Sequence, residues 1–511
     1  MNIGVVDVIS HKIDYSLNTK ILNPIKSSIG AQSIACWLEE LGHNVKYISF
    51  TGSENIIKEF SNDLDILFIS SYTHTAYLAI SISTYFRSVG VITVLGGPHA
   101  RAFTEDSKNY FDFIIGLCDK NLLRYLLSIS KEKSPSGTGQ YLFSDSQPND
   151  FPSIKQRWKY IVYNYKKIPT WANFPIIVPS LTSTGCPYSC DFCVDSSIPY
   201  KSLDLNQLKE DIIFLKEKIK NGIAGILFYD PNLGIGINKR IEIIKTHSSN
   251  NIKFLGEMNL TTMSPDIVLE LSKIGFIALA PGIESWTSYH NKSIGDCNKS
   301  KLDKVNKTSD KINFILNHIP LLQANLIFGM DCDSGQEPFL LTKEFIKQTP
   351  RAVTNFQTIT AFGGSALSRK MKDENRLIDL PYFLMDGFSS TNIKLNYNLS
   401  DFYLYYSDIV KFSNSNFIFA KKILSSSSFA FGLFHTLRKC SRGRGSHKYY
   451  KKLSNYMKTV EFESFYNGDS KKPPEIYHNL LKTQLKSFYN LLPEKIIDYF
   501  EGKKYCERGI N

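Results

Sequence analysis

The sequence predicts an α/β protein with two parallel sheets, one after the other along the chain, followed by a mostly helical C-terminal domain. Two observations support this fold class. Short apolar runs alternate with segments of helical periodicity over residues 3–116, and the alternation returns over residues 176–362. Such alternation is typical of parallel sheets, because each helix carries the chain back to the start of the next strand.

The first sheet is expected within residues 1–130. Its predicted strands are 3–9, 45–50, 66–72, 91–97 and 111–116. Its predicted helices are 27–42, a segment around 54–60, and 76–90. Helices between consecutive strands favour a doubly wound sheet, whose ligand site lies beyond the carboxyl ends of the strands. Residues 70–75 and 96–99 should therefore share one rim.

Residues 131–170 are rich in Ser, Pro, Gly and Asn, and we predict a linker or a wrapping segment there. The alternation resumes within residues 171–375. The predicted strands of this part are 176–183, 225–230, 252–259, 276–285, 321–330 and 354–362, with helices such as 205–222 and 265–275 between them. Six such repeats favour a partial (β/α)6 barrel of the TIM type, with its chemistry in the loops after the strands. Residues 376–511 are aromatic and lysine-rich, and form the predicted helical domain.

The bulk composition limits the compartment and the partners. Of 511 residues, 42% are apolar and 13% aromatic, which is enough to bury large cores. No run reaches the ~18 apolar residues that span a bilayer, and the N-terminus lacks the features of a signal peptide. We therefore expect a cytoplasmic protein without a membrane partner. The net charge of +12 admits nucleic acid or phosphorylated partners, but its even spread favours an ordinary solvated surface.

Three of the nine cysteines are bunched in residues 183–196, which read STGCPYSCDFCVDS. In a reducing compartment, the grouping of Cys186, Cys190 and Cys193 is typical of a metal site rather than of disulfides. Three thiolates leave a closed structural zinc site one ligand short, and no second close cysteine pair exists to complete it. A four-iron cluster held by three cysteines instead keeps one iron open to a small molecule.

The segment from Cys186 to Cys193 resembles the radical S-adenosylmethionine (SAM) superfamily. That superfamily carries CxxxCxxC in the loop after the first barrel strand, commonly with an aromatic residue before the last cysteine. The resemblance implies a 4Fe–4S cluster on Cys186, Cys190 and Cys193. SAM would chelate the open iron and be cleaved reductively to a 5′-deoxyadenosyl radical, while the protein orients the cofactor. It also assigns Phe192 to the adenine edge of SAM.

Later barrel strands carry further expected SAM contacts. The segment 282–285 resembles the GIES segment of many members, which implies that Glu284 and Ser285 meet the nucleoside. The segment 228–232 reads FYDPN and resembles an acidic amino-group-binding motif whose second acid is here a proline. The resemblance leaves Asp230 as the acceptor for the methionine ammonium.

Two more positions belong to the same expected rim. Glu257 ends the third barrel strand, and Gly363 follows the sixth, where glycine would let the backbone approach adenosine closely. The alternatives are a helix cap or a surface position for an acid at a strand end, and a plain turn for Gly363. Cys332 receives no role, because a buried free cysteine is ordinarily a small apolar residue.

The first sheet carries a second resemblance. Residues 95–100 read LGGPHA and resemble the glycine loop of the Rossmann-like cobalamin-binding domains that are joined to radical SAM barrels in class B type methylases. Residues 116–119 occupy the slot where these proteins usually read GEGE. Glycines there would let the backbone approach the corrin or its nucleotide tail. The expected cobalamin contacts are Ser70, Thr73, His74, Gly96, Gly97, Pro98 and His99.

One cobalamin pattern is absent. The Asp-x-His-x-x-Gly signature, whose histidine binds cobalt in other cobalamin domains, does not occur, and neither His11 nor His74 lies in that frame. Many radical members do without a histidine on cobalt, so we still expect the cofactor. A domain that has kept the fold and lost cobalamin is the alternative, and His74 and His99 would then be hydrogen-bonded loop residues.

Together the resemblances span about residues 1–375 and imply a cobalamin-dependent radical SAM enzyme. The expected outcome is methylation of an unactivated carbon in a small-molecule or peptide natural product. Cyclisation or rearrangement on the same scaffold is one alternative. An RNA-modifying enzyme is another, but the first 180 residues show no second cysteine triad, and we do not expect a nucleic-acid partner. An iron–sulfur sensor without enzyme activity is the third.

An external electron donor such as flavodoxin or ferredoxin is the implied protein partner. The substrate and the catalytic side chains stay open, because the C-terminal domain carries no recognisable motif.

Overall fold

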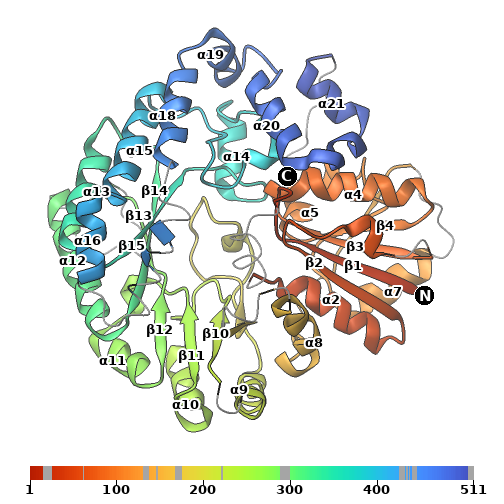
Figure 1. Cartoon of the computed structure of the whole chain (residues 1–511), viewed down its shortest axis with the longest axis horizontal. Helices are drawn as coiled ribbons and strands as arrows, with labels where there is room; N and C mark the ends of the chain where they lie inside the picture. Colours follow the sequence, from red (N-terminus) through yellow and green to blue (C-terminus); the bar gives the residue numbers. More distant parts are fainter. Residues whose placement is uncertain are drawn as a thin grey trace.

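The structure is a computed structural model that describes all residues except 15–25, 61–62, 131–136, 146–147, 167, 169–174, 220–221, 288–299, 425–431, 433–434, 437, 440–445 and 504–511. Two parallel sheets lie on opposite sides of the molecule, and the C-terminal helices form an arc that joins them (Figure 1). Among the described helices, none combines the length and the apolar character needed to cross a membrane.

The first sheet has six parallel strands in the order β2-β1-β3-β4-β5-β6. They are β1 (Asn2–Val8), β2 (Asn44–Phe50), β3 (Ile66–Ser71), β4 (Ile92–Gly96), β5 (Phe113–Ile115) and β6 (Gln140–Leu142). Helices α2 (Ile29–Glu40) and α7 (Lys120–Ser130) share one core cluster with the sheet, and α4 (Ala76–Ser88) packs into the other. The predicted doubly wound sheet is therefore confirmed.

The segment 131–170, predicted as a linker, holds two regular elements among its described residues. β6 pairs with β5 and extends the first sheet. α8 (Ile154–Tyr165) begins at a capping box formed by Ser153 and Gln156. The sequence prediction missed both elements. β6 has three residues, too few for a periodic pattern, and the surrounding Ser, Pro and Asn residues dominate the composition.

The second sheet is an open barrel of parallel strands in the order β7-β10-β11-β12-β14-β15, with β13 paired to β14. They are β7 (Ile176–Ser180), β10 (Ala224–Phe228), β11 (Ile252–Gly256), β12 (Phe276–Leu279), β13 (Gly282–Glu284), β14 (Leu321–Phe328) and β15 (Val353–Thr358). β12 and β13 are two halves of the fourth predicted strand. They are separated at Pro281, which lacks the N–H that a ladder needs. The predicted partial barrel is confirmed.

The C-terminal region is mostly helical, as predicted, and contacts both sheets. α15 (Leu399–Ser413) and α18 (Ser446–Tyr456) pack together beside the barrel, and α20 (Glu475–Leu485) and α21 (Glu494–Glu501) lie near α4 (Figure 1). The ring of Tyr77 on α4 lies 5.4 Å from that of Tyr382 and 5.9 Å from that of Phe500. One continuous apolar core therefore joins the three parts.

A buried arginine on α8 ties the two sheets together. Arg157 is 2% exposed, and its guanidinium donates to the Pro179 carbonyl on β7 at 2.9 Å and to Gln32 Oε1 on α2 at 3.0 Å. Its Nε donates to the Pro152 carbonyl at 2.9 Å. The charge of Asp211 on the barrel helix α9 (Leu205–Ile219) lies close enough to stabilise the guanidinium. One side chain thus sets how the first sheet sits against the first barrel strand.

Arg157→Ala should lower the free energy of unfolding by about 3 kcal/mol, because it leaves buried acceptors on α2, on β7 and at Pro152 without their donor. Chemical denaturation monitored by circular dichroism measures the loss. Lys155→Ala on the exposed face of the same helix is the control and should change stability by less than about 0.5 kcal/mol. Equal stability of the two variants would show that the hydrogen bonds of Arg157 are not needed for the stability of the fold.

Candidate active site

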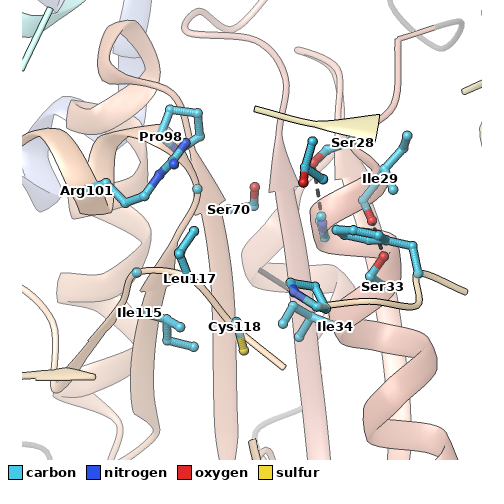
Figure 2. A pocket seen from close by; sticks show the side chains of 18 of the residues that line it. Ser28, Ile29, Ser33, Ile34, Ser70, Pro98, Arg101, Ile115, Leu117 and Cys118 are labelled. Carbon is cyan, nitrogen blue, oxygen red and sulfur yellow. Dashed lines mark hydrogen bonds between the residues drawn. The ribbon is translucent and has the colours of Figure 1, made fainter. Parts of the chain in front are cut away.

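The carboxyl ends of the two sheets open onto one shared cavity of about 370 Å³. This volume lies in the range of pockets that bury small ligands. Figure 2 shows Ser28 and Ile29 at the start of α2 on one side, Pro98 and Arg101 on the other, and Ser70 between them. The opposite wall comes from the barrel: Leu181, Thr184, Gly185, Asp195, Ile198, Tyr229 and Pro231. A ligand bound to the first sheet and a ligand bound to the barrel would therefore lie in the same cavity.

The three clustered cysteines lie on one loop beside this cavity. The loop runs from β8 (Ser183–Thr184), which pairs with β9 (Lys201–Ser202), to a 3₁₀ turn, η3 (Val194–Ser197). The Cys186 N–H donates to the Ile198 carbonyl at 3.3 Å, and the Cys193 N–H to the Cys190 carbonyl at 3.2 Å. Gly185 has a φ of 65°, and a Cβ there would lie 2.3 Å from the Pro199 carbonyl oxygen, so only glycine fits.

The donor set of this loop suits an iron–sulfur cluster, although its side chains are not yet gathered. Cys186 is buried, and Cys190 and Cys193 are half-buried. Among the described residues, no three His, Cys, Asp or Glu side chains converge closely enough to hold a metal ion. Burial, and next the charge of Asp195, raise the pKa of the Cys193 thiol to about 11.

Phe192 and Asp191 anchor the far side of the loop. Phe192 packs against an apolar cluster that includes Ile327 of β14 and Leu367 of α14 (Ala366–Asp373). The Leu367 N–H donates to the Asp191 carbonyl at 2.8 Å. Phe192 thus lies at the fifth- and sixth-strand side of the barrel mouth.

Asp230 is placed differently from the expectation that it accepts the methionine ammonium. It is fully buried, and accepts from the Thr182 N–H at 3.1 Å and from the Thr182 and Ser183 hydroxyls at 2.6 Å each. Arg240, itself 2% exposed, pairs with it at 3.4 Å and also donates to the Thr182 hydroxyl. The carboxylate is fully used inside the protein, where it anchors the chain that leads into the cysteine loop.

Two glutamates of the expected rim, Glu257 and Glu284, lie at the ends of barrel strands. Glu257 follows β11 with an exposed side chain in a concave part of the surface, and this enclosure, with the charge of Asp195, raises its pKa. Glu284 ends β13 with a φ of 65°, a backbone conformation that costs a non-glycine residue of order 1 kcal/mol. Such strain at a strand end in the barrel mouth is typical of functional sites.

Ser285 and Gly363 make contacts within the protein rather than toward a cavity. The Ser285 hydroxyl donates to Asp333 at 2.9 Å, and its carbonyl accepts from Lys304 at 2.7 Å. A Cβ on Gly363 would lie 2.4 Å from the Ala102 carbonyl oxygen. The close approach that requires this glycine is therefore to the first sheet's α5 (Pro98–Ala102), not to adenosine as expected.

Four of the seven expected cobalamin contacts line the cavity: Ser70, Gly96, Gly97 and Pro98. Gly97 has a φ of 90°, which favours glycine, and its Cα faces the Ser71 backbone. A Cβ on Gly96 would meet nothing within 4 Å, so this glycine keeps space open beside the cavity. The glycine loop thus fits a bulky ligand that needs close backbone approach.

The other three expected contacts do not line the cavity. His99 is 1% exposed, and its ring lies 4.8 Å from that of Tyr382 in the core between the first sheet and the C-terminal region. Thr73 is buried in the turn η1 (Thr73–Thr75). His74 stacks on Tyr72, and burial lowers its pKa, so its imidazole is neutral at pH 7. The expected contacts of Thr73, His74 and His99 with cobalamin stay predictions, and these three residues lie outside the cavity lining.

Sequence reasoning missed several residues that line or support the cavity. Tyr72 and Tyr229 line it from opposite sheets, and Arg101 faces it from α5. Asp7, at the end of β1, is fully buried and accepts from the Ser28 N–H at 2.9 Å. Burial raises its pKa to about 7, although its hydrogen bonds oppose that rise. Tyr72 and Tyr229 stand next to positions that were singled out, but a tyrosine carries no pattern that marks it.

Comparison with known proteins agrees with this geometry. The family model "Radical SAM superfamily" matches residues 180–322, which include the cysteine loop and strands β10 to β13. The chain contains a radical SAM domain. The enzyme is similar to two curated proteins of Chlorobaculum tepidum. It is 24% identical to bacteriochlorophyllide d C-8(2)-methyltransferase over 61% of this chain and 70% of that protein. It is 21% identical to bacteriochlorophyllide d C-12(1)-methyltransferase over 66% of this chain and 72% of that protein.

A solved structure shares the overall fold. TsrM from Kitasatospora setae, a radical SAM methyltransferase solved with cobalamin and a [4Fe-4S] cluster bound, aligns with a TM-score of 0.53 and 12% identity. The alignment covers 73% of this chain and 75% of that one. A likeness at this identity shows that the overall fold is shared.

Asp230→Ala should lower the free energy of unfolding by about 3 kcal/mol, because Arg240 would stay buried without its carboxylate. Glu257→Ala, which removes an exposed carboxylate from the same rim, is the matched control and should change stability by less than about 0.5 kcal/mol. Both are measured by urea unfolding. An unchanged stability in Asp230→Ala, together with weaker SAM binding, would restore the ammonium role.

Proposed function

We propose that the enzyme is a cobalamin-dependent radical SAM methyltransferase that methylates an unactivated carbon of a small molecule or peptide. One observation carries the proposal: the glycine loop of the first sheet and the cysteine loop of the barrel line the same cavity. Two separate ligand sites would not need the carboxyl ends of the two sheets to face one another.

The cofactor sites follow from the residues on each wall. Cys186, Cys190 and Cys193 would hold the 4Fe–4S cluster and leave one iron for SAM. Ser70, Gly96, Gly97 and Pro98 would hold cobalamin against the first sheet. When bound, the cluster supplies the electron that cleaves SAM, and cobalamin carries the methyl group. The barrel residues orient both ligands and shield the chemistry from water.

The relatives support carbon methylation. The two Chlorobaculum tepidum proteins are named for methylation of bacteriochlorophyllide d at numbered positions, and TsrM was also solved with tryptophan as substrate. All three act on ring-containing small molecules by name, so a small molecule is the favoured substrate class here. The electrons for turnover must come from outside the chain, and we propose flavodoxin or ferredoxin as the donor.

Replacing Cys186, Cys190 or Cys193 by Ala should in each case abolish iron–sulfur absorption and reductive cleavage of SAM, because the three thiolates hold one cluster. Iron and sulfide analysis after anaerobic reconstitution measures the first, and 5′-deoxyadenosine formation the second. Cys36→Ala, in the core of the first sheet, and Cys332→Ala, exposed at the barrel, are the controls and should keep normal cluster content. Normal content in any variant of the three would exclude that cysteine as a ligand.

Products distinguish methylation from the other outcomes. A methyltransferase of this kind consumes two molecules of SAM per turnover, and 5′-deoxyadenosine and S-adenosylhomocysteine should accumulate in equal amounts. Methyl-deuterated SAM should deliver an intact trideuteromethyl group to the product, as mass spectrometry detects, because methyl transfer breaks no C–H bond in the methyl group.

Cyclisation or rearrangement would give 5′-deoxyadenosine with little S-adenosylhomocysteine and no label in the product. That result would overturn methylation and leave the radical chemistry in place. Copurification of RNA with the enzyme, and labelling of that RNA, would favour the RNA-modifying alternative.

A further inference from the structure

Two tyrosines from different sheets face the cavity with uncovered rings. Tyr72 follows β3, and Tyr229 follows β10. Each is 41% exposed, although both line the enclosed space between the sheets. Large aromatic side chains inside a cavity usually cover each other or a core, because burial of a ring is strongly favourable. These two rings thus present apolar area that a ligand can cover.

The position of Tyr72 is fixed from behind. Its N–H donates to the Thr75 hydroxyl at 3.0 Å, and its carbonyl accepts from the Ser71 hydroxyl at 2.9 Å. Its ring stacks on that of His74 at 5.8 Å with 26° between the planes, and His74 in turn meets His11 edge-on at 5.7 Å. The His74 imidazole therefore supports the Tyr72 ring, and His11 in turn supports His74.

The position of Tyr229 is fixed by its neighbours in the chain. Its N–H donates to the Ser180 carbonyl at 2.9 Å, which extends the pairing of β10 with β7. Asp230, the next residue, is held by Thr182, Ser183 and Arg240. Consecutive side chains in extended backbone point to opposite sides, so the buried Asp230 leaves Tyr229 directed toward the cavity.

Both phenols are neutral at pH 7. Burial raises the pKa of Tyr229 to about 12, with further contributions from Asp7 and Glu257. The pKa of Tyr72 is also raised, by burial, by Asp7 and by Tyr229 itself. Both phenols line the same cavity, Tyr72 from the first sheet and Tyr229 from the barrel. Two neutral rings on facing walls suit a flat, largely apolar ligand.

We propose that Tyr72 and Tyr229 form an aromatic clamp that positions the corrin ring of cobalamin, with Tyr72 on the first sheet and Tyr229 on the barrel. The inference rests on the proposed function, because it assumes that cobalamin occupies this cavity. The clamp draws on both sheets, so cobalamin bound there also fastens the first sheet to the barrel. Tyr72 and Tyr229 are thereby positioning residues, and the clamp depends on their rings rather than on their hydroxyls.

The test uses the full-length enzyme with its cluster reconstituted and hydroxocobalamin as the probe. Equilibrium dialysis gives the Kd for the unmodified enzyme and for Tyr72→Ala, Tyr229→Ala, Tyr72→Phe and Tyr229→Phe. Each Ala variant should raise the Kd about tenfold, and each Phe variant less than about threefold, because Phe keeps the ring. Tyr125→Ala, at a 51% exposed tyrosine on α7 outside the cavity, is the matched control and should bind as the unmodified enzyme does.

Two further readouts separate positioning from misfolding. Iron content should stay normal in all variants, because the cysteine loop is untouched. Hydroxocobalamin should raise the thermal unfolding midpoint of the unmodified enzyme, and this rise should shrink in both Ala variants. Tyr72→Leu, which keeps apolar bulk without a flat ring, replaces Tyr72→Ala if the latter loses iron, and it too should weaken binding.

The outcomes distinguish this inference from the proposed function. No binding of hydroxocobalamin to the unmodified enzyme would overturn the proposed function, and the clamp with it. Tight binding to the unmodified enzyme and equally tight binding to both Ala variants would overturn the clamp alone. If Tyr229→Ala weakened the binding of SAM and left the binding of hydroxocobalamin unchanged, Tyr229 would be assigned to SAM. That result would likewise overturn the clamp.

Discussion

The buried guanidinium of Arg157 sets the geometry on which the rest of the site depends. It joins α2, which begins at the cavity, to β7, which leads into the cysteine loop. The carboxyl ends of parallel strands already gather loops at one edge of each sheet. What the strands cannot decide is how two such edges face one another. The Arg157 guanidinium is 2% exposed and donates to α2 and to β7, and these bonds fix how the two edges face one another.

Most charged and polar groups at the barrel mouth hold loops rather than point at ligands. Asp230 and Arg240 fasten the start of the cysteine loop, and Asp333 fastens Ser285. A buried carboxylate with several donors is expensive to expose, so these groups keep the loops in one arrangement. Recognition is left to the backbone at glycines such as Gly96, to aromatic rings, and to the few exposed acids, among them Glu257.

The sequence predicted the fold well, because strand and helix periodicity is local. It also located the cysteine loop, whose spacing carries its chemistry. It did not predict the contacts that His99, Gly363 and Asp230 make within the protein, for a common reason. His99 meets Tyr382 and Gly363 meets Ala102 from distant parts of the chain, and Asp230 meets Arg240 and Thr182 only after folding. A resemblance predicts that a residue lies at the ends of the strands. The direction of its side chain depends on packing against distant parts of the chain.

Burial keeps a thiol and a phenol of the cavity walls in their neutral forms. The pKa of Cys118 is raised to about 12 and that of Tyr229 to about 12, so both stay protonated at pH 7. Asp7, below Ser28 and Ser70, titrates only near 7 for the same reason. Protonated thiols and phenols are poor ligands for a metal centre. A flat cofactor on these walls would therefore be held by contact and shape.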